Sequence, residues 1–356
     1  MLRILLLLNS YPSSFIMKNS GKCLLAGFLW LTVTNSLHTQ NFVYKIGYFG
    51  FLDNREYFNE FANDQTIFGS RIYGEAGYTF NERNRIMAGA NYLYEFGSKG
   101  EWIAPDITAY FSGRYKHLDF LIGAFPRANM TAMPLALMTD TLGYYRPNME
   151  GILLDYGTQN FHHNLWIDWT SRQSYQKRET FLLGFSGYAK IGIFLYQHHF
   201  IMTHLAHSLA HGSDELIRDN AGFSLMPGVD LSAISGLDSL TFSAGLLGSY
   251  DRIRSKYDFR FPLGFYAELE AAHKGFGVHG ILYAGESQVI TSGDGFYKSD
   301  FYSRADAFYR LSASHIEGRL QFSFHFIPDM IDLSMSLLVR AQLDGMFRSH
   351  QSTSPK

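Results

Sequence analysis

The fold is decided by the stretch Arg260-Phe261-Pro262-Leu263-Gly264-Phe265-Tyr266-Ala267-Glu268-Leu269-Glu270-Ala271, in which apolar and polar side chains alternate. An extended strand with this period of two places the apolar residues on one face and the polar residues on the other. The polar face carries Glu268 and Glu270, and two carboxylates would be costly in a dry core. The stretch therefore predicts a strand with one face in lipid and the other in a water-filled lumen, with Pro262 marking its rim.

The same alternation recurs along the chain from residue 43 onward. In the segment 316–326, every second residue from Leu320 to Phe326 is apolar, and the residues between them are polar. Segments of this kind predict antiparallel strands that follow one another in chain order. Their ranges are 43–50, 70–80, 84–95, 102–114, 117–125, 150–157, 161–169, 179–188, 191–200, 220–229, 238–250, 258–272, 275–285, 299–311, 316–326 and 331–347.

The connections between these strands sort by length. Every second connection is mostly long and polar or irregular, as at 51–69 and 126–149, whereas the intervening ones, such as 115–116 and 273–274, are mostly tight. Membrane barrels have short turns on one side and long loops on the other, whereas a soluble Greek-key sandwich has no reason to sort its loops by side. The sequence thus predicts an all-β fold, a transmembrane antiparallel up-and-down β-barrel of about 16 strands with both termini in the periplasm.

Composition supports a β-rich chain and excludes some partners. Aromatic residues make up 16% of the chain, and 33 glycines stand against 9 prolines, a mix that favours strands and tight turns. The net charge of −2 argues against a nucleic-acid partner, which needs a basic face. The sequence contains no Gly-rich phosphate loop, paired-cysteine motif or nucleotide fingerprint, so we expect no cofactor.

The N-terminal region 1–39 has the pattern of a secretory signal peptide. A basic segment that starts at Met17 precedes an apolar run that starts at Cys23, and this order predicts a true start at Met17. The alternative is a membrane anchor, but the run is shorter than the ~20 residues that a spanning helix needs. Cleavage leaves a mature chain without cysteine, in which 40–347 forms the barrel and 348–356 a polar C-terminal tail.

An even strand count, an export signal, a cysteine-free mature chain and side-sorted loops together resemble the porin-type outer-membrane barrels of Gram-negative bacteria. The resemblance covers nearly the whole mature chain, although a polar tail follows the aromatic Phe347 at the end of the last strand. It implies a location in the bacterial outer membrane and passive diffusion of small solutes. It also implies outer-membrane lipids and the barrel assembly machinery as partners, and it leaves homo-oligomerisation open.

Two other functions remain open. A barrel with a closed lumen could act as a surface binding or assembly protein, and a lipase- or protease-type barrel enzyme would need a nucleophile with a positioned base. His162 and His163 near Asp168, or His279 and His325 on lumen faces, are the residues from which such a site would be built. Because single residues scattered over strands are weak evidence for catalysis, we expect no enzymatic activity.

Charged residues on the predicted lumen faces form two groups. One is a basic wall on strands that become neighbours when the last strand pairs with the first, and the other is a set of acids across the lumen. Together they would create a transverse field that orients dipolar solutes, unless nearby acids neutralise the wall locally. The predicted pore-lining residues are Lys45, Arg71, Arg85, Arg114, Arg304, Arg310, Arg319 and Arg340 on the basic wall, and Asp155, Asp168, Glu268 and Glu270 opposite.

The long connection 126–149 is too apolar for a loop in water. The resemblance to porin-type barrels implies that it folds into the lumen as a constriction loop, with Arg127, Asp140 and Arg146 at the narrowest point. The competing hypothesis is that it packs over the rim or against a neighbouring subunit. The stretch Phe51 to Tyr57, in the predicted first loop, looks like a family signature without an assignable function.

Five histidines lie close together in and beside the connection 201–219, and imidazoles at such spacing can bind zinc or copper. If this connection forms a short helix, three of them share one face. The chain offers no cysteine there and the nearest acids lie at the end of the loop, so we favour a polar external loop and predict no metal site. The five are His198, His199, His204, His207 and His211.

Overall fold

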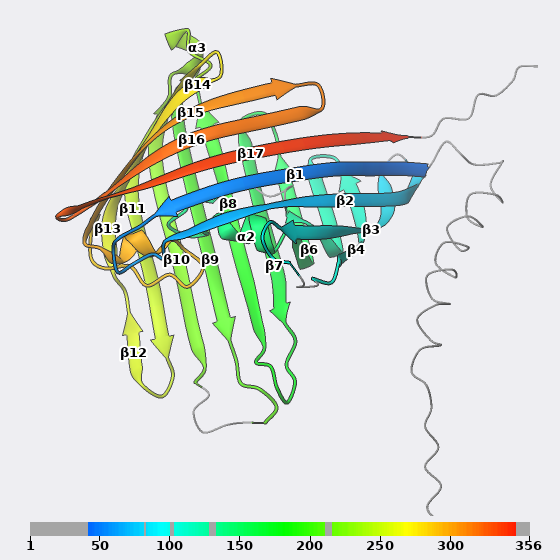
Figure 1. Ribbon diagram of the computed structural model, residues 1–356, viewed down its shortest axis with the longest axis horizontal. Helices are drawn as coiled ribbons and strands as arrows, with labels where there is room; N and C mark the ends of the chain where they lie inside the picture. The colour runs from blue at the N-terminus through cyan, green and yellow to red at the C-terminus, as the bar shows by residue number, and fades with distance from the viewer. Residues whose placement is uncertain (1–41, 82, 100–102, 128–132, 211–215, 347–356) are drawn as a thin grey trace, which may run out of the picture. The chain divides into compact units, whose positions relative to one another are not determined.

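The computed structural model describes residues 42–81, 83–99, 103–127, 133–210 and 216–346, and within them the chain forms one antiparallel barrel (Figure 1). The predicted signal region, the polar tail and Phe347 lie outside the described residues, so these predictions stay predictions.

Each strand pairs with the next along the chain, and the barrel closes where β1 pairs with β17. The short β12 and the following β13 are one strand interrupted at Phe261 and Pro262, because both pair with β11. The barrel therefore has 16 strands, as predicted. The strands are β1 (Phe42–Glu56), β2 (Gln65–Asn81), β3 (Asn84–Glu95), β4 (Asp106–Tyr115), β5 (Leu118–Pro126), β6 (Asn148–Gly157), β7 (Phe161–Ser171), β8 (Thr180–Ile191), β9 (Phe194–Leu205), β10 (Arg218–Asp230), β11 (Ser239–Ile253), β12 (Tyr257–Arg260), β13 (Leu263–His273), β14 (Phe276–Gly285), β15 (Phe301–Ala313), β16 (Ile316–Ile327) and β17 (Met330–Met346).

The predicted division into two faces is confirmed in the strands that suggested it. In β13, Phe265 and Leu269 are exposed while Tyr266 between them is fully buried, and in β16 exposed phenylalanines alternate with the buried Gln321 and His325. Exposed apolar side chains therefore face outward, where lipid takes the place of water. The side-sorted loops are also confirmed, since one side of the barrel carries mostly tight turns.

Within the described ranges the few helices are short and lie in the connections. They are α2 (Thr141–Tyr145), α3 (Ser232–Ser235) and the 3-10 helix η3 (Gly295–Lys298). Among the described residues, no helix has the length and apolar character needed to span a bilayer.

Two predicted loops are shorter than expected. The strand β1 continues to Glu56 and β2 begins at Gln65, so most of the stretch Phe51 to Tyr57 is strand and not loop. Its alternation simply continues above the apolar band, where the outer face can carry the polar residue Asn54. In the same way β9 runs to Leu205, which places His204 in a strand and contradicts the helix considered for 201–219.

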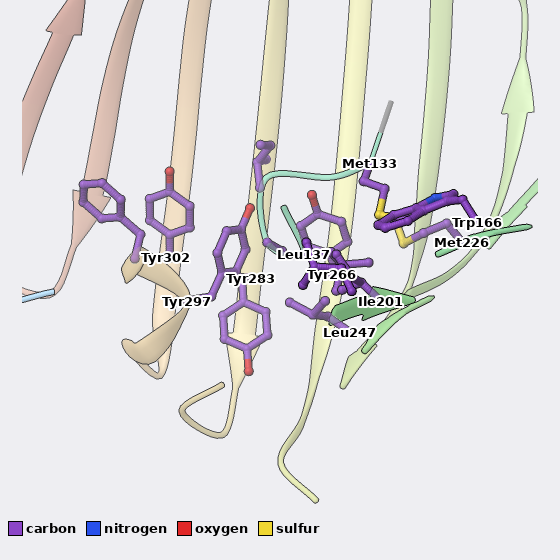
Figure 2. Close-up of a cluster of buried hydrophobic side chains, with 14 of the residues drawn as sticks. Met133, Leu137, Trp166, Ile201, Met226, Leu247, Tyr266, Tyr283, Tyr297 and Tyr302 are labelled. Atoms are coloured by element: carbon purple, nitrogen blue, oxygen red, sulfur yellow. The ribbon is translucent and has the colours of Figure 1, made fainter. Parts of the chain in front are cut away.

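The barrel interior contains an apolar core. Figure 2 shows Met133 and Leu137 of the connection between β5 and β6 lying among inward-facing side chains of the wall, including Trp166 and Met226. In a membrane barrel the lumen is normally polar, so an apolar core inside needs chain to cover it. Here residues 133–147 and 286–300 of the connections supply that cover.

Candidate functional site

The long connection between β5 and β6 lies inside the barrel, as the inward hypothesis predicts, and not over the rim. Ala136 and Leu137 are completely buried, and Met133 and Tyr144 nearly so. In Figure 1, α2 lies within the outline of the barrel, behind β1 and β2. The apolar residues that made this loop unsuitable for water are the ones that pack against the inner wall.

A second inward connection, 286–300, meets the first one. The amide of Thr139 donates to the carbonyl of Ser292 at 2.8 Å, and the amide of Asp294 donates to the carbonyl of Leu135 at 2.9 Å. A Cβ on Gly222 of β10 would lie 2.8 Å from both Leu137 and Ile290, so the wall needs a glycine where the two loops press against it. The two loops thus form one body inside the barrel.

The stretch Phe51 to Tyr57 holds this body on the other side. Arg55 lies 2.6 Å from Asp53 and 2.8 Å from Asp140, so it joins β1 to the inserted loop. The ring of Tyr144 stacks on Phe51 with centroids 4.8 Å apart. The stretch that the sequence singled out without a function is therefore an anchor for the inserted loop.

A buried ion pair fixes the base of the loop. Arg127 donates to Asp168 of β7, and the second carboxylate oxygen of Asp168 accepts from the amide of Glu150 at 3.0 Å. Asp168 is 0% exposed, and Arg146 lies 3.9 Å from it. Arg127 and Arg146 thus converge on one carboxylate at the loop base, whereas Asp140 pairs with Arg55 of β1.

The first connection also turns inward. The amide of Phe58 donates to Asp332 of β17 at 2.8 Å, and the ring of Tyr57 packs edge-on against Phe296 of the second inserted loop at 5.0 Å. A Cβ on Gly295 would lie 2.0 Å from the carbonyl oxygen of Phe61, so the two loops touch through a glycine. Three connections therefore share the interior.

The loops leave one side of the lumen open. A cavity of about 650 Å³ lies between the inserted loop and the wall formed by β1–β4 and β17. It extends to the turn between β15 and β16, which is on the periplasmic side by the predicted topology. The wall contributes Lys45, Phe49, Arg71, Tyr73, Glu75, Asn91, Thr108, Arg340, Gln342 and Asp344, and the loop contributes Met133, Leu135, Met138, Asp140 and Leu142.

Only part of the predicted basic wall faces this cavity. The strands that carry it are neighbours, as expected, but of its eight residues only Lys45, Arg71 and Arg340 line the cavity. The other five make contacts outside the cavity or are exposed. Arg304 pairs with Asp306 at 2.6 Å, and Arg114 pairs with Asp119 at the surface. Arg310 and Arg319 lie over the ring of Phe308, and Arg85 is exposed.

The predicted acidic residues across the lumen do not act as a free group. Asp168 is sealed against Arg127, Asp155 pairs with His162 at 2.7 Å, and Glu268 accepts from the hydroxyl of Tyr266. Glu270 lies opposite His279 in the register of β13 and β14. Three of the four carboxylates are therefore engaged individually by the inserted loop or by neighbouring side chains, and they do not form one free acidic surface.

The histidines are divided between the two faces of the barrel wall. His199 points inward and is buried, whereas His198 points outward, where its Nε2 lies 3.2 Å from Nδ1 of His163. The ring of His163 lies over Gly187. His204 bonds Asp219 at 2.8 Å. His207 lies in the connection after β9, and His211 lies outside the described residues. Among the described residues no three metal-binding side chains are grouped closely enough to hold an ion.

One serine lies beside a lumen histidine. His325 contacts the hydroxyl of Tyr302 at 2.8 Å through Nδ1 and the hydroxyl of Ser334 at 3.2 Å through Nε2. This order of hydroxyl, imidazole and orienting group is one that hydrolases use. The rings of Tyr57 and Phe296 cover His325 at 5.2 and 4.5 Å, so the group is closed by the inserted loops. Sequence reasoning included His325 but missed both of its partners.

The second inserted loop and the rings of Phe49 and Tyr73 were also missed. A usable signal is present in the sequence, since Phe296 and Tyr297 are an apolar pair within a long connection. The same argument that placed 126–149 inside the barrel applies to them.

A comparison with protein families matches residues 34–347 to the lipid A 3′-O-deacylase-type family. No curated protein matches the sequence significantly.

Among solved structures, the fold is similar to that of OmpT, an outer membrane protein of Vibrio cholerae, in a form that lacks loop L8. The TM-score is 0.52 at 8% identity, over 85% of this chain and 99% of that one. Pseudomonas putida OprB gives 0.51 at 9% identity, over 85% and 94%. Pseudomonas aeruginosa OpdO gives 0.51 at 11% identity, over 86% and 98%. This likeness confirms the porin-type outer-membrane barrel fold, and the apolar outer face of the barrel is suited to contact with lipid.

Proposed function

The chain belongs to the lipid A 3′-O-deacylase-type family, and we propose that this member is a channel for the passive diffusion of small solutes across the outer membrane. The observation that carries the proposal is the cavity beside the inserted loop. A loop that filled the lumen completely would leave no such space, whereas a loop held to one side of a wide barrel narrows it without closing it.

The walls of the cavity suit a water-filled path. Polar groups of the strands, such as Asn91, Gln342 and Thr108, line one side of the cavity, and charged side chains line it as well. Charged side chains in contact with water in a pore set which ions pass, because the low dielectric of the wall strengthens their field. The proposed constriction lies between α2 and the side chains of Phe49 and Arg71.

The test is the current through single proteins in a planar bilayer. The intact barrel is expected to conduct, and deletion of residues 133–142 is expected to raise its conductance by about twofold or more, since it removes the loop that narrows the lumen. A suitable control deletes the surface connection 173–177, which does not line the cavity. Absence of current in both the intact and the deleted form would contradict the channel and favour a closed barrel that binds at the surface.

A second candidate function is hydrolysis of an acyl ester of lipid A, and family membership is the observation that favours it. The arrangement of Ser334, His325 and Tyr302 would supply a nucleophile, a base and an orienting group. The hydroxyl of Ser334 would attack the ester carbonyl while His325 accepts its proton, and His325 would then give this proton to the departing sugar hydroxyl, which leaves an acyl-serine. Water, deprotonated by His325, would attack the acyl-serine and release the fatty acid and the free Ser334 hydroxyl. The covering rings of Tyr57 and Phe296 would have to move first.

Mass spectrometry of lipid A incubated with the folded protein tests this candidate. Loss of one acyl chain, abolished by Ser334→Ala but retained by Ser336→Ala on the same strand, would support it. Unchanged lipid A, with the barrel shown to be folded by its heat-modifiable migration on gels, would refute it.

A further inference from the structure

Arg71 is the most unusual charged residue in the cavity. Its side chain is only 3% exposed, yet it lines the cavity. Its terminal nitrogens donate to the carbonyl oxygens of Gly143 and Tyr144 in α2, while Nε has no partner. Among the described residues it takes part in no ion pair. A buried guanidinium without a carboxylate is costly unless an anion reaches it.

Two further cations line the same cavity without an ion-pair partner among the described residues. Arg340 lies over the ring of Phe49 at 5.1 Å, and Lys45 lies over the ring of Tyr73 at 5.8 Å. An aromatic ring holds a cation in place without neutralising its charge. Three positive charges are therefore displayed on one wall of the cavity.

Acids line the cavity as well and are distributed along it. Asp140 pairs with Arg55, and Glu75 accepts from the hydroxyl of Tyr110 at 3.2 Å. Glu317 lies opposite Arg340 in the register of β16 and β17, and Asp344 lies near the end of β17. Next to α2, where Asp140 is paired with Arg55, the charge that is not neutralised is therefore the positive charge of Arg71.

The opposite wall is apolar. The inserted loop presents Met133, Leu135, Met138 and Leu142 to the same cavity. A solute in this space touches cations on one side and apolar side chains on the other. The arrangement matches a molecule with one negative group and an apolar body, because each part meets the surface that favours it.

We propose that the cavity binds and selects amphipathic monoanions, that is, small carboxylates that carry an apolar ring or chain. The carboxylate lies between Arg71 and Arg340, where a guanidinium can donate two parallel hydrogen bonds. The apolar body lies against the inserted loop. The inference deepens the proposed channel and rests on it for transport, whereas the binding itself can be measured separately.

The test uses calorimetric titration of the full barrel in nanodiscs with three probes: benzoate, acetate and benzylamine. Benzoate is expected to bind about tenfold or more tightly than acetate, which lacks the ring, and than benzylamine, which reverses the charge. Arg71→Gln is expected to weaken benzoate binding by about tenfold or more. The matched control Arg85→Gln removes the same charge from an exposed position outside the cavity and should change binding by less than about twofold.

Equal binding of benzoate and benzylamine, or equal loss in the two arginine variants, would overturn the proposal. If Arg71→Gln does not fold, Arg71→Lys keeps the charge and should retain most of the binding. Current recordings in the same buffers separate the two proposals. Benzoate binding by a barrel that carries no current would refute the channel and leave the site, whereas current without a preference for benzoate would refute the site and leave the channel.

Discussion

The two sides of the barrel interior differ in what they offer to the inserted loops. From β5 to β15 the inner wall carries large apolar and aromatic side chains, among them Trp166, Tyr266 and Tyr283, and the loops pack against it. From β1 to β4 and on β17 the inner wall carries cations and polar groups, and there the cavity remains. The same strand pattern thus yields a sealed wall and an open wall.

The difference teaches that the outer face of a barrel strand is set by lipid, whereas its inner face is free to be polar or apolar. Where inward positions are apolar, burial of about 25 cal/mol per Å² favours a covering loop. Where they are charged, desolvation opposes the same contact. The position of the cavity therefore follows from the choice of inward residues strand by strand.

Removal of the ion pair at the loop base should have the largest effect on the sealed wall. Arg127→Met leaves Asp168 buried without its partner, which is expected to lower the free energy of unfolding by about 3–5 kcal/mol. The control is Arg114→Met, whose arginine is 65% exposed in its pair with Asp119 and should contribute about 1 kcal/mol or less. Urea unfolding of both variants in lipid vesicles measures the difference, and similar losses would contradict the buried pair's role.

Truncation of a buried loop side chain that packs against the same wall should have the next largest effect. Leu137 is 0% exposed between the wall and the second loop, so Leu137→Ala is expected to lower stability by about 2–5 kcal/mol. Leu142→Ala removes the same atoms from a side chain that lines the open cavity, and it should lower stability by clearly less. The same unfolding assay applies, and an equal loss at the two positions would show that the loop is packed alike on both sides.

The outer face of the sealed wall provides a third measurement. Leu269 lies near the middle of β13 and points outward, so Leu269→Arg is expected to lower stability by about 2–4 kcal/mol. The inward neighbour Glu268→Gln should have little effect, because its hydrogen bond from Tyr266 can be kept. The opposite order of stabilities would place the faces one residue out of register.

The smallest effect is expected from pH, at the contact between the two loops. Burial raises the pKa of Asp294, whose backbone bonds Leu135 in the first loop. Because the unfolded chain loses this proton at lower pH, the stability that Asp294 contributes is complete below pH 3.8 and is lost as pH rises through the raised pKa. The free energy of unfolding of the intact protein and of Asp294→Asn, measured from pH 7 down to pH 4, checks this. Only the intact protein should gain stability from this group as the pH falls. An identical pH dependence of the two proteins would refute the assignment.

Much of the fold could be predicted from the alternation of apolar and polar residues with a period of two and from the lengths of the connections. The strand number, the faces of β13 and β16 and the closure of β1 with β17 follow from alternation that lipid enforces. The inward loop was readable because Met133 and Leu137 cannot remain in water. The alternation could not predict which inward-facing charges lack an ion-pair partner. These partners lie on loops from distant parts of the chain, which pair Asp168 with Arg127 but leave Arg71 unpaired. Alternation predicts on which face of a strand a residue lies, but it does not predict which residue forms an ion pair or hydrogen bond with it.

The contact between the first connection and β17 has a consequence for the order of assembly. The amide of Phe58 bonds the carboxylate of Asp332, two residues separated by 274 positions in the chain. Contacts this far apart form late, because the intervening chain must lose its freedom first. Since β17 also closes the sheet against β1, one event pairs the last open edges and fixes the first connection. The interior of this barrel therefore cannot reach its final packing until the last strand of the chain is in place.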